Sequence, residues 1–376
     1  MPKNGKIHIV HIVTSLEPGG LENGVVNLAR NLDPERFQTS VLCLERKGEF
    51  CERLSPRNEL ICLEKPPGFR PLTSLRIARL LREMKADIVH THNLGPLLYG
   101  TLAKLVSTRR FALVQGEHAQ LREDERTPRR RRIRKISYRL CRAVHTVSEG
   151  LRRELIEFGL PASLIRVIRN GVDSDRFCPN SDSSRASETL SEDFVIGMVG
   201  RFGAFKRHDL LIQAFEVLAG GDPHLRLLIV GDSGPEKERI VQMMEDSPFR
   251  DRISWVGFQQ DPIPFYRQMN LLVVPSENEG LSNAMLEALS CGVPCLAHPA
   301  CGAGEIIEEG RNGFLREMRD TKTFAGELAT VIEMVKGDTS YSAEARASAC
   351  ENFSLEVMMD GYRRMYEEEA EEGGII

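Results

Sequence analysis

Short apolar runs rich in β-branched residues alternate along the whole chain with segments whose apolar residues recur at helical spacing. This alternation is typical of parallel sheets whose strands are joined by crossover helices. The strand-like runs lie at residues 7–13, 41–44, 87–90, 111–115, 144–147 and 167–168, and again at 195–199, 225–230, 253–256, 271–274, 294–297 and 313–315. The pattern therefore predicts an α/β protein with two doubly wound, Rossmann-like domains.

A polar stretch separates these two halves. Residues 179–192 are rich in Ser and Asp and have no apolar periodicity, which is typical of a linker. We therefore expect an N-terminal domain at residues 1–178, a linker at 179–192, a second domain at 193–353 and a final segment at 354–376. Apolar residues at helical spacing predict a helix at the start of that last segment, and the Glu-rich tail beyond Tyr366 is expected to fray into solvent.

Composition limits the class of protein. The 376 residues are 41% hydrophobic and 28% charged, which suits a globular chain with two cores. A net charge of −4 argues against general nucleic-acid binding, and nine cysteines without a C-x2-C pair favour a reducing compartment. The start of the chain does not read as a signal peptide, and no apolar run approaches the roughly 20 residues that span a bilayer. We expect a cytoplasmic protein, at most peripheral on the inner face of the membrane.

Two glutamates, Glu279 and Glu287, stand eight positions apart across a strand-to-helix turn. Ser282 or Asn283 can cap the helix, which is expected to end near Cys291. The N–H groups at the start of a helix make a ready anion site, and carboxylates can bind sugar hydroxyls. The turn therefore predicts a pocket for a nucleotide sugar.

The stretch from Glu279 to Pro294 resembles the signature of retaining glycosyltransferases of the GT-B fold, in the large family with two glutamates flanking seven residues (glycosyl transferases group 1). The resemblance implies two domains facing a cleft, with the donor in the C-terminal domain and the acceptor in the N-terminal one. It also implies that the last helix crosses back onto the N-terminal domain. Glu279 would lie near the transferred sugar and Glu287 would bind the ribose hydroxyls. The amides near Leu281, Ser282 and Asn283 would face phosphate or sugar.

Two basic residues follow the first strand of the second half. Arg201 and Lys206 resemble the family's Gly-Arg…Lys element, which holds the nucleotide diphosphate. Fixed cations stabilise the negative charge that develops on a departing diphosphate; the alternative is a solvent-exposed basic loop. Family members often have Gly after the lysine, where this chain has Arg207. The resemblance also places the backbone at Phe258 against the nucleobase.

A glycine loop opens the first helix. Gly19 and Gly20 let the backbone come close to a ligand. The loop lacks the G-x-G-x-x-G spacing, which disfavours a nicotinamide enzyme. It resembles the family's glycine loop near the donor phosphates, and the string from Gly19 to Leu28 resembles a subgroup linked to exopolysaccharide assembly.

Histidines follow two of the strand-like runs. The resemblance places His118 beside the donor sugar, although a lone histidine is often structural. His90 and His92 share one strand face, as a zinc pair or, on the family reading, as the wall of the cleft. Asp173-Ser174-Asp175 matches the Asp-x-Asp metal motif of another glycosyltransferase fold, which we interpret as a coincidence. With Arg201 and Lys206 supplying positive charge, no metal and no other cofactor is expected.

The densest basic run lies in a segment with apolar residues at Ile133, Ile136 and Leu140, and consists of Arg129, Arg130, Arg131, Arg132, Arg134 and Lys135. Such a helix is either a solvated face or an amphipathic surface drawn to anionic lipid, where each cation contributes about 1 kcal/mol. Without interleaved aromatic residues, nucleic acid is a poor partner.

Together these features predict a metal-independent, retaining glycosyltransferase. It would move a hexosyl unit from a nucleotide-diphosphate sugar to a hydroxyl of a glycan or lipid-linked acceptor, in exopolysaccharide or cell-surface glycan synthesis. The alternatives are a sugar-nucleotide epimerase or phosphorylase of the same fold, or a non-catalytic partner that binds a sugar nucleotide.

Overall fold

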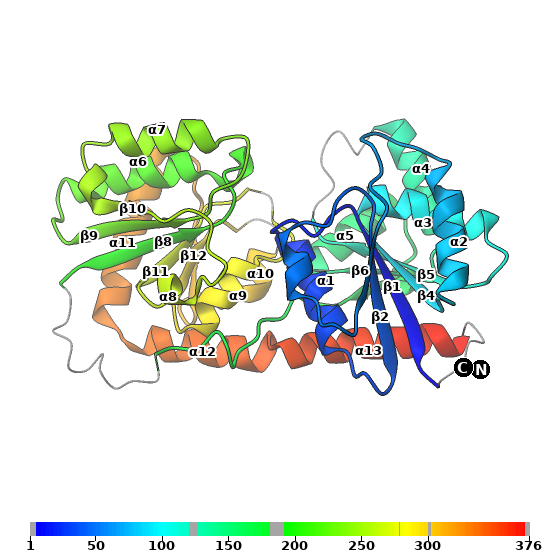
Figure 1. The fold of residues 1–376 in the computed structure, drawn as a ribbon. Helices are drawn as coiled ribbons and strands as arrows, with labels where there is room; N and C mark the ends of the chain where they lie inside the picture. Colours follow the sequence, from blue (N-terminus) through cyan, green and yellow to red (C-terminus); the bar gives the residue numbers. More distant parts are fainter. Residues whose placement is uncertain (1–4, 120–126, 181–191, 278, 300–301, 373–376) are drawn as a thin grey trace. The chain divides into compact units, whose positions relative to one another are not determined.

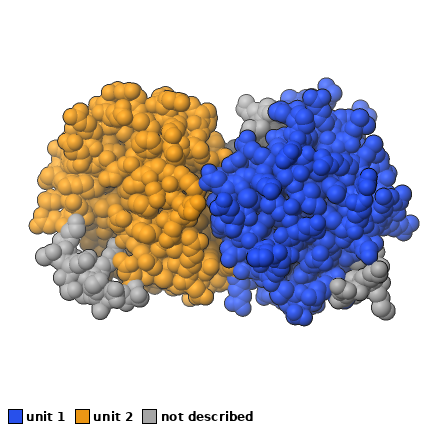
Figure 2. All heavy atoms as spheres, viewed as in Figure 1, with its two compact units in different colours: residues 1–170, 356–376 blue, residues 171–355 orange. Residues whose placement is uncertain are grey.

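The chain forms two compact units in a computed structural model that describes residues 5–119, 127–180, 192–277, 279–299 and 302–372. Unit 1 contains Met1–Asn170 and Glu356–Ile376, and unit 2 contains Gly171–Leu355 (Figures 1 and 2). The sequence analysis places the first boundary eight residues later, at residue 178. Most of the predicted linker lies outside the described residues.

Unit 1 is built on a parallel sheet with the strand order β3-β2-β1-β4-β5-β6-β7 (Figure 1). Its strands are β1 (Ile7–Val13), β2 (Phe37–Cys43), β3 (Glu59–Cys62), β4 (Ile88–His92), β5 (Ala112–Glu117), β6 (Ala143–Thr146) and β7 (Ile165–Val167). Its helices are α1 (Gly20–Asn31), α2 (Thr73–Glu83), α3 (Leu94–Val106), α4 (Pro128–Tyr138), α5 (Glu149–Phe158) and α13 (Leu355–Glu372).

Unit 2 is built on a second parallel sheet with the order β10-β9-β8-β11-β12-β13. Its strands are β8 (Phe194–Val199), β9 (Leu225–Val230), β10 (Ile253–Trp255), β11 (Leu271–Val274), β12 (Cys295–Ala297) and β13 (Gly313–Leu315). Its helices are α6 (His208–Ala219), α7 (Lys237–Asp246), α8 (Ile263–Tyr266), α9 (Asn283–Ser290), α10 (Ala303–Ile306), α11 (Thr321–Gly337) and α12 (Ser340–Asn352).

The strand order confirms the prediction of two doubly wound α/β domains, and every predicted strand is present. The sequence analysis missed β3, a four-residue strand that begins with an exposed glutamate and whose remaining side chains are only half-buried. In each sheet the order reverses once, between β1 and β4 and between β8 and β11. Ligands of such folds bind at the carboxyl ends of the strands beside this reversal.

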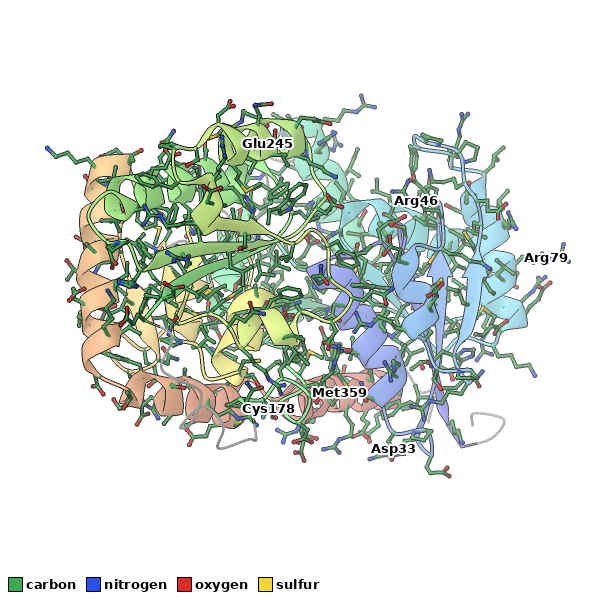
Figure 3. The ribbon with its side chains drawn as sticks, turned by 60° about the vertical axis from the view of Figure 1, so that its left-hand side comes forward. Asp33, Arg46, Arg79, Cys178, Glu245 and Met359 are labelled. Carbon is green, nitrogen blue, oxygen red and sulfur yellow. The ribbon has the colours of Figure 1, made fainter. Side chains whose placement is uncertain are left out.

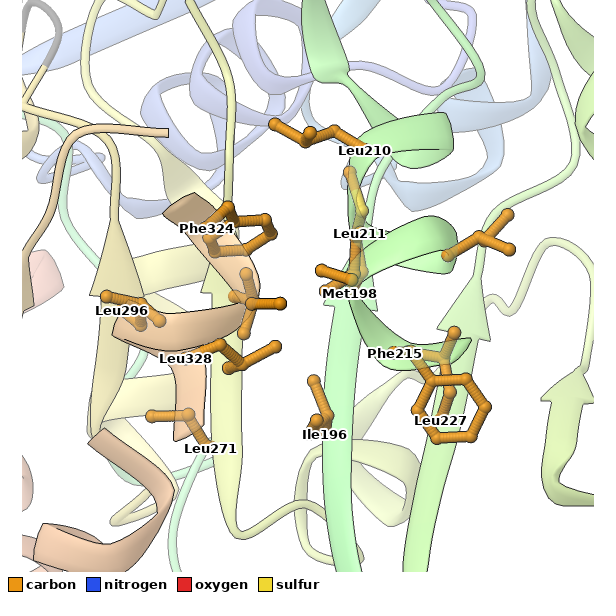
Figure 4. Packing of buried hydrophobic residues seen from close by; sticks show 14 of the residues in the cluster. Ile196, Met198, Leu210, Leu211, Phe215, Leu227, Leu271, Leu296, Phe324 and Leu328 are labelled. Atoms are coloured by element: carbon orange, nitrogen blue, oxygen red, sulfur yellow. The ribbon is translucent and has the colours of Figure 1, made fainter. Parts of the chain in front are cut away.

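Helices α6 and α11 pack against each other and bury one face of the second sheet. Phe215 of α6 and Phe324 of α11 pack with strand residues such as Ile196 and Leu271, and all four are fully buried (Figure 4). Removal of such large apolar side chains from water is the main favourable contribution to folding. The packed strands thereby hold the loops at their carboxyl ends in place.

The expectation of a frayed acidic tail is wrong for residues 367–372. Helix α13 continues to Glu372, and Glu369 and Ala370 are buried against unit 1. Arginines of unit 1 account for the ordered acidic residues: Arg142 pairs with Glu369 at 3.3 Å and also with Glu372 at 3.0 Å. Ion pairs with Arg142 therefore stabilise the last turn of α13, although its acidic sequence suggests a solvent-exposed tail.

Helix α4 turns its isoleucines outward and one arginine inward. Ile133 is 39% exposed and Ile136 is 49% exposed, whereas Arg134, which the sequence analysis counts in the basic run, is 1% exposed. Arg134 donates to Glu117 at 2.9 Å and to the hydroxyl of Tyr138 at 2.9 Å, and that hydroxyl donates to Glu117 at 2.7 Å. A buried charge is tolerated here because it is paired and hydrogen-bonded. Arg134 is consequently withdrawn from the exposed basic surface.

Charged side chains elsewhere on the outer helices point into solvent, as Arg79 of α2 shows (Figure 3). Within the described part of the chain, no helix is both long enough and apolar enough to cross a bilayer.

The buried pair predicts a large stability effect for Glu117→Gln. The variant leaves the Arg134 charge buried without its counter-ion, and loss of one partner of a buried pair costs about 3–5 kcal/mol. We expect the free energy of unfolding, measured in urea, to fall by an amount in this range.

The matched control is Glu83→Gln, which removes the exposed partner of Arg79. Water screens such a pair, so this variant should unfold nearly as the natural chain does. Equal, small effects of the two substitutions would contradict the account of the buried pair.

Candidate active site

Three loops of unit 2 meet at the carboxyl edge of its sheet. They follow β8, β9 and β11, and β8 and β11 are the neighbours between which the strand order reverses. Five of the residues predicted to bind a nucleotide sugar lie on the loops after β8 and β11: Arg201, Lys206, Glu279, Leu281 and Ser282. The topology thus brings together residues more than 70 positions apart in the sequence.

The central contact of this edge joins Lys206 to Glu279. The Nζ of Lys206 forms an ion pair with Oε1 of Glu279, and the two side chains are only 17% and 18% exposed. Limited access to water strengthens the electrostatic interaction. The structure therefore places a predicted phosphate-binding cation and a predicted sugar-binding carboxylate in direct contact.

Arg207 stands where family members often have glycine, and it adopts the backbone conformation that glycine favours. Arg207 has a φ of +57°, a left-handed conformation that glycine adopts most easily. Its guanidinium pairs with Glu277, and the backbone N–H of Glu277 donates to the carbonyl of Phe205 at 3.0 Å. The loop keeps the geometry that favours glycine and adds an ion pair between the loops after β8 and β11.

Glycines allow the loops after β8 and β9 to touch. A Cβ on Gly231 would collide with the carbonyl oxygen of Gly200, so any side chain at residue 231 would force the two loops apart. The N–H of Phe202 donates to the carbonyl of Ser233 at 2.7 Å, which fixes this approach. The N–H of Gly231 donates to the carbonyl of Gly257 at 2.8 Å, beside the predicted base-binding residue.

Two predicted residues of this unit are open to a ligand. Arg201 is exposed at the start of the loop after β8. Phe258 follows β10, and its ring is 40% exposed although it is aromatic. An exposed aromatic ring suits a planar base, and an exposed guanidinium suits a phosphate.

Glu287 lies on α9, one turn from the start of that helix. Ser282 occupies the predicted cap position, but its side chain makes no capping hydrogen bond among the described residues. Leu281 is buried beside it. The Glu287 carboxylate accepts a 2.7 Å hydrogen bond from the hydroxyl of Tyr266, whose pKa is raised by burial and by the charge of Glu287. The sequence analysis missed Tyr266, because nothing in its sequence context marks it as the partner of a glutamate 21 residues away.

In unit 1, the predicted glycine loop follows β1, at the point where the strand order reverses. Helix α1 begins at Gly20, and the first helical hydrogen bond runs from the N–H of Asn23 to the carbonyl of Gly19 at 2.9 Å. Gly20 is exposed. The start of α1 therefore lies where a ligand of a doubly wound sheet is expected.

His118 follows β5 and joins a cluster of imidazoles. Its Nε2 lies 3.0 Å from Nδ1 of His92, and Nε2 of His92 lies 3.1 Å from Nδ1 of His11. His90 and His145 complete this histidine cluster, which the sequence analysis saw only in part. Burial lowers the pKa of His118 to about 4 and that of His11 to about 3, so both rings are neutral near pH 7.

The buried network beneath His118 fixes the end of β5. Glu117 contacts Arg134 and Tyr138, and its Oε1 also accepts a 2.9 Å hydrogen bond from the amide of Gln115. The side chain of Thr91 donates to Gln115 at 2.5 Å. Several hydrogen bonds therefore fix the Glu117 side chain, which holds the following residue, His118, in position.

Comparisons with known proteins agree with this architecture. The family model "Glycosyltransferase Family 4" matches residues 18–176, and "Glycosyl transferases group 1" matches residues 180–348. The chain is similar to an N-acetyl-alpha-D-glucosaminyl L-malate synthase of Bacillus anthracis, with 26% identity over 82% of this chain and 81% of that protein. It is also similar to the capsular polysaccharide biosynthesis glycosyltransferase CapM of Staphylococcus aureus, with 25% identity over 97% of both chains.

Among solved structures, Anabaena Alr3699/HepE in complex with UDP and glucose superposes with a TM-score of 0.82 at 22% identity, over 96% of this chain and all of that chain. A likeness at this identity concerns the fold, which is the same. The two family matches and the two doubly wound sheets define the class: the chain is a glycosyltransferase of the GT-B fold. It belongs to the family of glycosyl transferases group 1, as the resemblance implies, with a Family 4 N-terminal half.

A buried histidine beside Lys206 predicts acid sensitivity of unit 2. His208 begins α6 and packs edge-on against Phe202, with ring centroids 4.8 Å apart. Burial, with a smaller contribution from the charge of Lys206, lowers the pKa of His208 to about 3. Below pH 6.5 the unfolded chain therefore binds a proton that the folded chain does not. Stability present above pH 6.5 should be lost toward pH 3, at about 1.4 kcal/mol per pH unit.

The free energy of unfolding in urea, measured between pH 7.5 and 5, reports this loss. The same measurement on His208→Gln serves as the comparison. The variant should show a shallower fall in unfolding free energy because glutamine does not titrate. Identical slopes for the two proteins would contradict the assignment to His208.

Proposed function

We propose that this glycosyltransferase moves a hexosyl unit from a nucleotide-diphosphate sugar to a hydroxyl of a glycan or lipid-linked acceptor, with retention of the anomeric configuration and without a metal ion. The observation that carries the proposal is the contact between Lys206 and Glu279 at the reversal of the second sheet. It unites a cation and a carboxylate at the edge where a doubly wound sheet binds its ligand.

The reaction explains why both charges are needed. Departure of the nucleoside diphosphate develops negative charge on the leaving oxygen, which Lys206 and Arg201 stabilise electrostatically. The amides at the start of α9 add positive partial charge toward the phosphates. When the diphosphate binds, Lys206 exchanges its carboxylate partner for phosphate, which releases Glu279 to accept hydrogen bonds from the sugar hydroxyls.

The remaining residues orient the donor. Glu287, held by Tyr266, accepts hydrogen bonds from the ribose hydroxyls. On the family resemblance, the neutral ring of His118 would bond to a sugar hydroxyl, and the amides at Gly20 would face phosphate. Retention follows if the acceptor attacks on the face that the diphosphate leaves, with the leaving phosphate oxygen taking the acceptor proton.

Related proteins support this substrate class. HepE binds UDP and glucose, and CapM takes part in capsular polysaccharide biosynthesis. A similar Escherichia coli enzyme, 24% identical over 88% of this chain, transfers galactose from UDP-galactose to a diphosphoundecaprenol-linked sugar. We infer a uridine diphosphate sugar as donor and a role in cell-surface glycan synthesis.

Ligand-induced stabilisation tests the donor site. We expect UDP and its sugars to raise the unfolding temperature in the presence of EDTA, because a ligand that binds only the folded state stabilises it. GDP and ADP should shift it less. In Lys206→Ala the UDP shift should disappear. Turnover in Lys206→Ala and Glu279→Gln should fall by about 10²–10³-fold, the usual effect of losing one group that stabilises developing charge or holds the substrate.

Arg207→Gly is the matched control for this test. It removes the neighbouring cation of the same loop and places glycine at a left-handed residue, so the loop keeps its conformation. The UDP shift should persist in this variant. Loss of the shift in both variants would point to general loop damage, and dependence of the shift on a divalent metal would overturn the metal-free site.

We also propose that α4 docks unit 1 on anionic lipid. Exposed Arg129, Arg130, Arg131 and Arg132 lie on the same helix as exposed Ile133 and Ile136, which is the composition of an interfacial surface. A shallow groove there is lined by Pro128, Arg131, Arg132, Lys135, Ile136 and Arg139. An acceptor carried by a lipid would make such docking useful.

Sedimentation with vesicles tests the docking surface. The protein should bind vesicles that contain phosphatidylglycerol and release them at high salt. Each basic residue near an anionic surface contributes about 1 kcal/mol, so Arg131→Ala/Arg132→Ala should weaken binding about 30-fold. Arg79→Ala on α2 should bind normally. Equal binding of all three proteins would refute the role of α4.

A further inference from the structure

A glycine in the first sheet creates a small space between two histidines. In the register of the parallel strands, His92 of β4 pairs with Gly116 of β5, and Gly116 pairs with His145 of β6. Residues paired in this way point to the same face of a sheet. Gly116 has no side chain, so the space between the two imidazoles is not filled by the strand that separates them.

Ring nitrogens converge on this space. A Cβ built on Gly116 would collide with Nε2 of His145 and would lie 2.8 Å from Nε2 of His118. Nδ1 of His92 lies 3.0 Å from the same nitrogen of His118. One ligand atom from each of His92, His118 and His145 lies within 4.8 Å of the others. Three nitrogens therefore face one point above Gly116.

His145 has unsatisfied hydrogen-bonding capacity. Its side chain is fully buried, and neither of its ring nitrogens has a hydrogen-bond partner among the described residues. A buried polar group without a partner costs about 1–3 kcal/mol, so each such group calls for an explanation. A ligand that accepts the lone pair of Nε2 would remove this cost.

We propose that His92, His118 and His145 form a binding site for a first-row transition-metal ion, with Zn²⁺ as the best fit. The site lies in unit 1, whereas Lys206 and Glu279 of the proposed diphosphate site lie in unit 2. It shares His118 with the proposed contact to the donor sugar, but its argument does not rest on the proposed function. Three imidazoles and no carboxylate suit Zn²⁺, Co²⁺, Ni²⁺ or Cu²⁺ and disfavour Mg²⁺, which prefers oxygen ligands.

The geometry requires only small movements. Zinc–nitrogen bonds of about 2.0–2.1 Å in a tetrahedron place ligand nitrogens about 3.3 Å apart, close to the separation of His92 and His118. His118 is half-buried and the following residue, Ala119, is exposed, so an ion has a path to the site. A fourth position stays open for water, as in other three-histidine sites.

The surrounding residues already orient one ligand. The Nε2 of His92 lies 3.1 Å from Nδ1 of His11, the type of second contact that metal-bound histidines usually make. His92 then coordinates through Nδ1. His118 coordinates through Nε2 in the tautomer that carries its proton on Nδ1. The alternative group of His11, His90 and His92 is fully buried, so an ion has no exposed ligand through which to reach it, whereas His118 is only half-buried.

Cobalt supplies the direct test, because tetrahedral Co²⁺ absorbs visible light strongly and octahedral Co²⁺ does so weakly. We expect chelator-treated protein to develop the tetrahedral absorption with one equivalent of Co²⁺, and one equivalent of Zn²⁺ to abolish it. Excess Mg²⁺ should have no effect. Absence of the absorption in the natural chain, together with no calorimetric binding of Zn²⁺, would overturn the proposal.

Two substitutions test the site by different routes. His145→Asn removes one ligand, and Gly116→Ala fills the space while keeping all three. Both should lower the Zn²⁺ affinity at least tenfold, whereas His224→Asn, which removes a histidine of unit 2, should leave it unchanged. Far-ultraviolet circular dichroism shows whether each variant is folded. If one variant does not fold, the cobalt titration of the natural chain and the other variant still test the site.

Cysteine is the competing ligand that the test separates. Cys43 of β2 and Cys62 of β3 lie opposite each other in neighbouring strands, and both are free thiols. Coordination by these residues would produce an intense thiolate-to-cobalt charge-transfer band and would survive both substitutions. Either of these results would assign the ion to cysteine and refute the histidine site.

Discussion

Hydrogen bonding between parallel strands, in one fixed register on either side of the strand-order reversal, determines where every candidate residue lies. In unit 2, pairing of β8 with β11 brings the loops of Lys206 and Glu279 together although 73 positions separate them. In unit 1, pairing of β4, β5 and β6 aligns His92, Gly116 and His145. A slip of one residue would turn His92 or His145 to the opposite face of the first sheet. The apolar cores that hold the register therefore also hold the sites.

The loops of unit 2 show how backbone geometry limits residue choice at such a site. Gly231 is required because another backbone segment occupies the place of its side chain. At residue 207 the same demand is met differently, since an arginine adopts the left-handed conformation and pairs with Glu277. The conformational cost of a non-glycine residue there is of the order of 1 kcal/mol, and an ion pair joining two loops offsets part of it. Loop geometry can therefore persist where the sequence pattern changes.

The sequence was sufficient to predict the two sheets, because buried parallel strands leave continuous apolar runs that local inspection detects. It was also sufficient to propose Lys206, Glu279 and Glu287, which stand in a recognisable order. Partners were harder to predict. Tyr266 and Arg134 acquire their roles only through contacts across the fold, and the outward turn of Ile133 on α4 follows from the pairing of Arg134 rather than from the apolar pattern. The usual rule assigns the apolar residues of a helix to its buried face, and a buried ion pair such as Arg134–Glu117 makes that rule fail.

The histidine cluster illustrates the same limit. His90 and His92 were detectable as a pair, because alternate residues of one strand share a face. His11 and His145 could not be added to them without the strand order, since they come from β1 and β6. Gly116 was harder still to connect with the histidines, because a glycine at the end of a strand is ordinarily explained by the backbone conformation that it allows. Here its importance lies in the side chain that it lacks, since any larger residue would occupy the space shared by His118 and His145. A site defined by an absent side chain becomes visible only once the neighbouring strands are in register.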